Sequence, residues 1–178
     1  MQITGRHPFH TRAAAFALLL AAVLPGASAR AADDTPGTGL PVPRFVSLKA
    51  DKVNVRNGPN RDQDVAWIFT RSGLPVEITA EFETWRRIRD AEGAEGWVYH
   101  SMLSGRRTAL VAPWGKDATV TLRDKPDANA KVAARLEPGV LGTVKTCDGK
   151  WCRLIGDGFD GFIEQGKLWG VYPNEKVD

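Results

Sequence analysis

The chain repeats itself, and this duplication constrains its fold more than any other feature. Three segments of the first half recur in the same order in the second half: VNVRNGP (53–59) as VTLRDKP (120–126), WRRI (85–88) as WCRL (151–154), and EGWV (95–98) as DGFI (160–163). The spacing between them is nearly constant and changes only in turn regions, where loops tolerate insertions and deletions. The sequence therefore predicts two copies of one small folding unit.

Each copy has the pattern of short strands separated by turns. Val53 and Val55 alternate with polar residues, as do Val76 and Ile78, so each pair shares one face of a strand. No segment after residue 45 is long and apolar enough to indicate a helix. Several short strands in about 65 residues favour a small barrel or sandwich. We expect an all-β fold, with a first domain at residues 45–110 and a second at 111–174.

The N-terminus has the three-part layout of a secretory signal peptide. Arg6 and Arg12 precede the apolar run AAAFALLLAAVL at residues 13–24, and small residues follow at 27–29. The run spans ~18 Å as a helix, whereas a bilayer core is about 30 Å thick, so a membrane anchor or a buried helix is the weaker alternative. We expect residues 1–29 to be removed, with cleavage after Ala29 or Ala31, and the mature chain to carry no transmembrane segment.

Removal of this segment also removes the basic excess. The full chain has 24 Lys and Arg against 21 Asp and Glu, a net charge of +3, and residues 1–29 hold two arginines and no acid. The mature chain is therefore nearly neutral, and this balance gives no electrostatic case for nucleic acid as a partner. Residues 30–44 are rich in proline and glycine without strand or helix periodicity, and they are expected to form a linker.

The two cysteines of the chain, Cys147 and Cys152, flank the turn signal Asp148-Gly149 between two β-prone segments. In an exported protein, such an isolated pair is most simply a disulfide across a hairpin. A redox site is the alternative, although the spacing is not C-x-x-C, and further ligands for a metal are lacking.

The repeated motif V-N-V-R-x-G-P, followed by W-x-x-I and G-W-V, resembles the bacterial SH3-like (SH3b) family over nearly all of residues 45–170. In the first repeat the likeness rests on Val53, Val55, Arg56, Gly58, Pro59, Trp85, Gly96, Trp97 and Leu103. In the second repeat the corresponding motif positions are Arg123, Pro126, Trp151, Gly161 and Phe162. The second repeat departs from the motif where Lys125 replaces the turn glycine and Phe162 replaces the tryptophan.

This resemblance implies two tandem SH3-like small β-barrels. It also implies an exported or envelope-associated protein, because many domains of the family are thought to bind peptidoglycan or peptides, often as parts of cell-wall hydrolases. Arg56 and Arg123 each precede a turn, where an arginine can donate to turn carbonyls or pair with a carboxylate. We interpret both as structural. The matched tryptophans Trp85 and Trp151 are interpreted as barrel packing.

Catalytic constellations are missing from the mature sequence. His100 is its single histidine, which leaves Ser-His-Asp, Cys-His and zinc sites without partners. No glycine-rich phosphate motif is present. We therefore expect no enzyme activity, no cofactor and no metal.

Candidate ligand contacts come from aromatic residues that differ between the repeats and from a basic cluster. Trp67 corresponds to Ala134 and Tyr99 to Glu164, so these two aromatics are less clearly core residues. Alternatively, Trp67, Trp114 and Trp169 fill an interface between the barrels. Arg86, Arg87 and Arg89, with Arg106 and Arg107, form the basic cluster, in which alternation places Arg87 and Arg89 together. The competing interpretation is a solvated face paired with Glu81, Glu83 and Asp90.

The sequence thus predicts a non-catalytic binding module of the periplasm or cell envelope, or a secreted one, that binds peptidoglycan or a peptide segment. The expected contacts are Arg87, Arg89, Trp67 and Tyr99 in the first domain. The alternative is a structural adaptor or assembly factor for an envelope protein partner.

Overall fold

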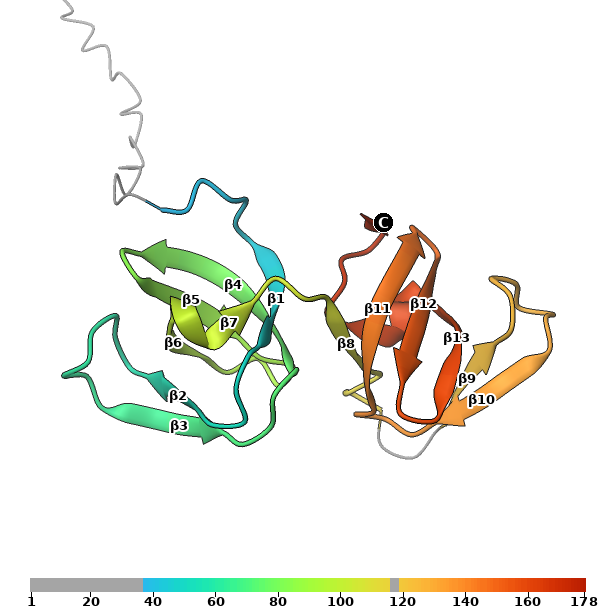
Figure 1. Ribbon diagram of the computed structural model, residues 1–178, viewed down its shortest axis with the longest axis horizontal. Coiled ribbons are helices and arrows are strands. Elements are labelled where there is room, and N and C mark those ends of the chain that lie inside the picture. The colour runs from blue at the N-terminus through green and yellow to red at the C-terminus, as the bar shows by residue number, and fades with distance from the viewer. Residues whose placement is uncertain (1–36, 116–118) are drawn as a thin grey trace, which may run out of the picture. The chain divides into compact units, whose positions relative to one another are not determined.

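The computed structural model describes residues 37–115 and 119–178, and within them the fold is built from two sheets (Figure 1). The expected signal peptide, residues 1–29, and the first part of the linker lie outside the described residues. The described residues group into one unit by their contacts. No helix among the described residues has the length and apolar character needed to cross a membrane.

The first sheet has seven strands in the order β3-β2-β6-β5-β4-β1-β7. Its elements are β1 (Arg44–Leu48), β2 (Val53–Arg56), β3 (Val65–Phe69), β4 (Pro75–Phe82), β5 (Trp85–Arg89), β6 (Glu95–Tyr99), the 3₁₀ turn η1 (His100–Met102) and β7 (Leu103–Ser104).

The second sheet follows the same path in the order β10-β9-β13-β12-β11-β8-β14. Its elements are β8 (Thr108–Val111), β9 (Val120–Arg123), β10 (Val132–Leu136), β11 (Leu141–Asp148), β12 (Trp151–Gly156), β13 (Phe159–Glu164), the 3₁₀ turn η2 (Gln165–Lys167), β14 (Leu168–Trp169) and β15 (Lys176–Val177), which pairs with β11. Because the strand orders correspond one to one, the duplication expected from the sequence is a duplication of topology, and the all-β, two-barrel prediction is confirmed.

Alternation along the strands creates one core in each barrel. In β2, Val53 and Val55 are fully buried while Asn54 between them is exposed, and Leu122 of β9 is buried in the same way. The first core is made of Val46, Leu48, Val53, Val55, Val76, Ile78, Ile88 and Val98. The second is centred on Ala109, Val111, Leu122, Val144, Cys152, Leu154 and Ile163.

Two glycine positions shared by the repeats have different structural reasons. Gly73 and Gly139 have φ of 76° and 80°, a left-handed conformation that favours glycine at this turn. Gly96 and Gly161 lie where strands approach closely: a Cβ atom would be 3.1 Å from the Arg56 carbonyl oxygen in one repeat and 2.8 Å from the Arg123 carbonyl oxygen in the other. These contacts explain why both repeats carry glycine at these positions.

Gly58 lies in the turn after β2. A Gly-Pro pair in a turn is typical of unusual backbone angles, but Gly58 is not among the described glycines with positive φ. The turn therefore adopts ordinary backbone angles, and Lys125 fits the matched position of the second repeat without strain.

The domain boundaries also differ from those expected at residues 45–110 and 111–174. All of β8, from Thr108 onward, pairs in the second sheet, since Thr108 lies opposite Thr143. The second sheet also extends beyond residue 174, because Lys176 and Val177 pair with Asp148 and Cys147. Hydrogen bonding along β11 explains both differences, because β8 and β15 pair with opposite ends of this long strand, along the edge that does not pair with β12.

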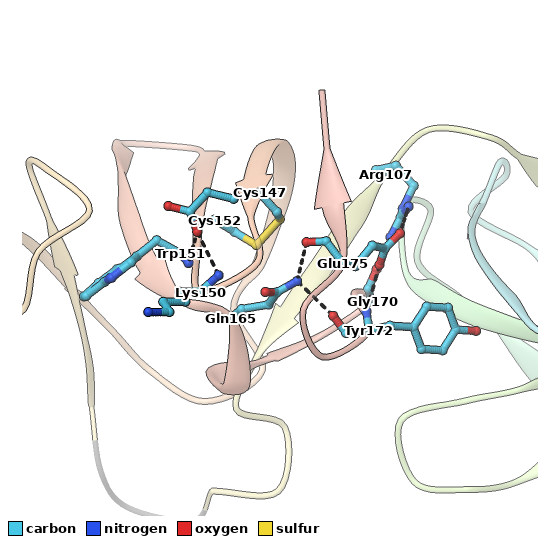
Figure 2. The surroundings of a disulfide bond; sticks show 10 residues. Arg107, Cys147, Lys150, Trp151, Cys152, Gln165, Gly170, Tyr172 and Glu175 are labelled. Carbon is cyan, nitrogen blue, oxygen red and sulfur yellow. Dashed lines mark hydrogen bonds and ion pairs between the residues drawn. A yellow bond between two sulfur atoms is a disulfide. The ribbon is translucent and has the colours of Figure 1, made fainter.

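The disulfide between Cys147 and Cys152 is confirmed. The two residues lie directly opposite each other on β11 and β12, with a Cα–Cα distance of 4.1 Å, and both are buried (Figure 2). The bond closes the hairpin from its inner face.

Candidate functional site

The first barrel carries a groove of about 420 Å³ between β2, β5 and the end of β6. We call it the first groove. Its lining residues are Lys52, Asn54, Arg56, Arg61, Trp85, Tyr99 and Met102. The set contains three basic side chains and no carboxylate, so the groove favours an anionic occupant.

Aromatic rings form one wall of the first groove. Trp85 is 7% exposed, and its ring packs edge-on against Tyr99 with the centroids 5.6 Å apart. The Arg61 guanidinium lies 5.6 Å from the centroid of the Tyr99 ring, within the range of a cation–π interaction. Because Arg61 contacts a ring rather than a carboxylate, its charge remains available to a ligand.

The second barrel carries a corresponding groove of about 340 Å³, which we call the second groove. Every residue that lines the first groove has its repeat counterpart in the lining of the second: Thr119, Thr121, Arg123, Ala128, Trp151, Glu164 and Lys167. The duplication has therefore preserved a concave surface as well as a fold.

The chemistry of the two grooves differs at the matched positions. Lys52 and Arg61 of the first groove correspond to Thr119 and Ala128 of the second. Glu164 takes the place of Tyr99. Lys167 takes the place of Met102. The second groove therefore has one cation fewer and one carboxylate more than the first, and an anionic ligand would bind it less well.

Arg56 and Arg123 have one structural role in both repeats. Arg56 Nη1 donates to the carbonyl of Gln63 at 2.6 Å, and Arg123 Nη1 donates to the carbonyl of Ala130 at 2.9 Å. Of the two roles considered from the sequence, hydrogen bonding to a turn carbonyl is therefore the one that the structure shows.

The four residues expected to contact ligand do not share one groove. Tyr99 lines the first groove. Trp67 is half-buried against the first core, with its ring edge-on to Phe69 at 6.1 Å. Trp67 therefore packs within the barrel, as part of neither the first groove nor an interface between barrels.

The two arginines, Arg87 and Arg89, share one face of β5 as expected, but carboxylates of the flanking strands pair with them. Arg87 Nη2 lies 2.7 Å from Glu95, and Arg89 pairs with the buried Glu77, directly opposite it on β4. Of the partners expected from the sequence, Glu81, Glu83 and Asp90, Glu81 does pair with the cluster through Arg86. For Arg87 and Arg89, register brings in Glu95 and Glu77 instead. Arg86, by contrast, is buried at 5% exposure and lies 3.2 Å from Glu81.

Sequence reasoning missed Lys52, Asn54, Arg61 and Met102. The signal was present, because Arg61 corresponds to Ala128 just as Tyr99 corresponds to Glu164. A comparison of the repeats that included charged residues as well as aromatics would have found Arg61. His100 is exposed at the start of η1, with its ring 4.9 Å from that of Tyr99. Within residues 37–115 and 119–178, no three His, Cys, Asp or Glu side chains group as metal ligands.

The family model of the bacterial SH3 domain matches the chain twice, over residues 49–105 and 116–170. The chain belongs to the bacterial SH3 domain family. The two SH3 domains coincide with the two sheets, and the resemblance inferred from the repeated motif is confirmed.

Solved structures similar to this SH3 pair share little sequence with it. NlpC2 and NlpC1 from Trichomonas vaginalis are each 14% identical with a TM-score of 0.34, over 71% and 75% of this chain. The matched region spans 48% of each Trichomonas chain. A structure named Endolysin LysPBC5 CBD is 15% identical with a TM-score of 0.29, over 71% of this chain and 91% of its own. Among curated proteins, no sequence match was found.

Proposed function

We propose that the chain is a non-catalytic binding protein of the bacterial envelope, and that its first groove holds an anionic segment of peptidoglycan, such as the carboxylates of its stem peptides. The observation that carries the proposal is the recurrence of one groove at seven matched positions, the first copy of which is lined by cations and no carboxylate. Membership in the bacterial SH3 family supports binding rather than catalysis.

The first groove supplies two kinds of contact for such a ligand. Lys52 and Arg61 are exposed cations, and arginine presents a fork of donors that matches a carboxylate. The Tyr99 ring offers an apolar surface beside them. Arg61 already rests on this ring, so less conformational freedom is lost when a ligand binds.

Co-sedimentation with purified peptidoglycan sacculi tests the proposal. Arg61→Ala combined with Tyr99→Ala removes two contacts of about 1 kcal/mol each, so affinity should fall by about tenfold or more. Binding of the parent should also weaken as salt rises, because exposed charges are screened over about 8 Å at physiological ionic strength. Arg135→Ala is the matched control, since it removes an exposed arginine of β10 that lines neither groove.

Two results would contradict this function. If the parent does not sediment with sacculi, the adaptor hypothesis takes precedence and a protein partner should be sought. If the double variant sediments like the parent and like Arg135→Ala, the first groove is not the binding site.

The proposal includes export, for which the buried disulfide and the family provide support. Intact mass of the protein from an exporting host should correspond to a chain that begins at Arg30 or Ala32. A mass that retains residues 1–29 in the envelope fraction would contradict removal of the signal peptide.

A further inference from the structure

A larger groove, of about 710 Å³, lies beside the second groove. We call it the aromatic groove, because its lining includes Phe45, Trp114, Trp151, Trp169 and Tyr172. Its volume falls within the range of about 300–1,000 Å³ that is typical of ligand sites. The aromatic groove is not one of the two matched grooves, and the proposed function does not use it.

The aromatic groove is continuous with the second groove. Trp114, Trp151 and Glu164 line both, so the two form one track along the second barrel. Trp114 stands on this shared wall and is 59% exposed, a large apolar surface left in contact with water. An interface between the barrels was one expected role for Trp114. Its exposure shows that this side chain does not fill such an interface.

Ring packing and hydrogen bonds hold the other rings of the aromatic groove in place. The Phe45 ring lies 5.1 Å from that of Trp169 and 4.7 Å from that of Tyr172, measured between centroids. The Tyr172 hydroxyl donates to Glu77 at 2.7 Å, and Trp169 Nε1 donates to the Pro75 carbonyl at 3.3 Å. These contacts fix the positions of the rings, and a fixed wall lowers the entropic cost of binding.

The backbone behind this wall is also fixed. Gln165 is buried, and its Nε2 donates to the carbonyls of Tyr172 and Glu175 at 2.8 and 2.9 Å (Figure 2). Arg107 donates to Glu175 and to the Gly170 carbonyl from the other side. The segment that carries Trp169 and Tyr172 is thus tied to the barrel at both ends.

The charges of the aromatic groove largely cancel. Glu77 and Arg89 pair with each other. The charges that remain along the track are those of the exposed Lys150, Glu164 and Lys167 and of the half-buried Arg123, so both signs are present. The first groove, in contrast, has cations alone, so the two sites suit ligands of different charge.

We propose that the aromatic groove and the second groove together bind the uncharged sugar rings of a glycan strand, with Trp114 and Trp151 stacking on them. Aromatic faces suit the apolar face of a sugar ring, and Lys150, Glu164 and Lys167 supply donors and acceptors for its hydroxyl and amide groups. The choice of a glycan rests on the proposed function, because peptidoglycan carries both a glycan strand and the anionic peptides assigned to the first groove.

Calorimetric titration of the purified protein with short oligomers of N-acetylglucosamine tests this inference. The parent should bind them saturably, and affinity should change little between low and high salt, because the probe carries no charge. Trp114→Ala should weaken binding by about tenfold or more. Since Trp114 is exposed, this variant should keep the thermal transition of the parent.

Two controls separate this site from others. Phe82→Ala removes an exposed aromatic that lines none of the three grooves, and it should bind the oligomers like the parent. Arg61→Ala with Tyr99→Ala should also bind them normally.

The inference is overturned if the parent does not bind the oligomers, or if Trp114→Ala binds them as tightly as the parent. Sedimentation of the parent with sacculi, in the absence of oligomer binding, would overturn this inference while leaving the proposed function intact. If the parent binds the oligomers but Arg61→Ala with Tyr99→Ala sediments with sacculi like the parent, the role of the first groove is contradicted and this inference stands.

Discussion

Glu81 connects the segment before the first barrel to strand β4. Its carboxylate accepts hydrogen bonds from the Thr38 amide at 2.6 Å and the Thr38 hydroxyl at 2.9 Å, and it pairs with Arg44 and Arg86. Burial alone would raise the pKa of Glu81. The hydrogen bonds from Thr38 and Arg44 outweigh burial and lower the pKa to about 2. Part of the expected linker is therefore anchored to the barrel.

Glu81→Gln should destabilise the folded chain at neutral pH. A carboxylate whose pKa is lowered on folding adds stability above its unfolded value near 4.5, and this stability is lost as pH falls toward about 2. With allowance for solvent screening, we expect a loss of about 1–2 kcal/mol at pH 7. Urea unfolding of parent and variant at several pH values measures it. The difference should shrink from pH 4.5 to pH 2, and a difference independent of pH would contradict the ionic role of Glu81.

The Glu81 contacts also show which hydrogen bonds of single residues the sequence does not predict. The hydrogen bond of Arg56 to a turn carbonyl spans seven residues and follows from a local motif. Thr38 and Glu81 are 43 residues apart, and no local pattern marks them as partners. Long-range polar contacts depend on strand register, which hydrophobic alternation sets only to within the correct face.

At the scale of elements, the β11–β12 hairpin is the part that sequence predicted most fully. The Asp148 carboxylate accepts from the amides of Trp151 and Lys150 at 2.8 and 2.7 Å, and Gly149 has φ of 102°. These hydrogen bonds lower the pKa of Asp148. The turn signal, the strand propensities and the cysteine spacing all act within a few residues, so they agree without knowledge of the tertiary fold.

Reduction of the Cys147–Cys152 disulfide should lower the free energy of unfolding by about 2 kcal/mol without abolishing the fold, because the closed loop is short. Urea unfolding with and without a reductant, followed by circular dichroism, measures the change. Mass spectrometry under the same conditions confirms that the bond is open. Equal midpoints with the bond open would show that the disulfide does not stabilise the fold, and complete unfolding in reductant alone would show that the fold requires it.

The residues of the grooves were predicted less completely than the hairpin and more completely than the long-range contacts. Tyr99 was found from the sequence because its repeat counterpart is not aromatic. Arg87 and Arg89 were expected beside it because they are basic, but Glu95 and Glu77 on neighbouring strands pair with them. Which cation remains free depends on cross-strand neighbours, and the sequence does not reveal these until the register is known.

At the scale of the whole molecule, contacts between residues far apart in the chain join the two SH3 domains. The Thr108 hydroxyl donates to the Gly73 carbonyl at 2.7 Å and lies 2.6 Å from the Ser47 hydroxyl. Trp169 packs on Phe45, as the interface alternative for this tryptophan anticipated. Duplication predicts two barrels, but it carries no information on how they contact each other, because such contacts need not repeat.

The hydrogen bond between Tyr172 and Glu77 is one of these contacts, and its contribution to stability can be tested. Glu77 is 2% exposed, and its carboxylate accepts from the Tyr172 hydroxyl at 2.7 Å. Burial and this hydrogen bond raise the pKa of Tyr172 well above its usual value, so the phenol stays protonated and its contribution is lost only at strongly alkaline pH.

Tyr172→Phe keeps the ring that packs on Phe45 and removes only the donor to Glu77. A buried carboxylate that loses a hydrogen bond should cost about 1–3 kcal/mol. We expect a lower urea midpoint for the whole chain, because Tyr172 lies in the second domain, between β14 and β15, whereas the carboxylate belongs to the first. Tyr99→Phe is the matched control, since it removes a hydroxyl from a half-buried tyrosine of the first groove, and its midpoint should stay near that of the parent. If Tyr172→Phe unfolds at the same urea concentration as Tyr99→Phe, the hydrogen bond to Glu77 does not contribute to the stability of the pair.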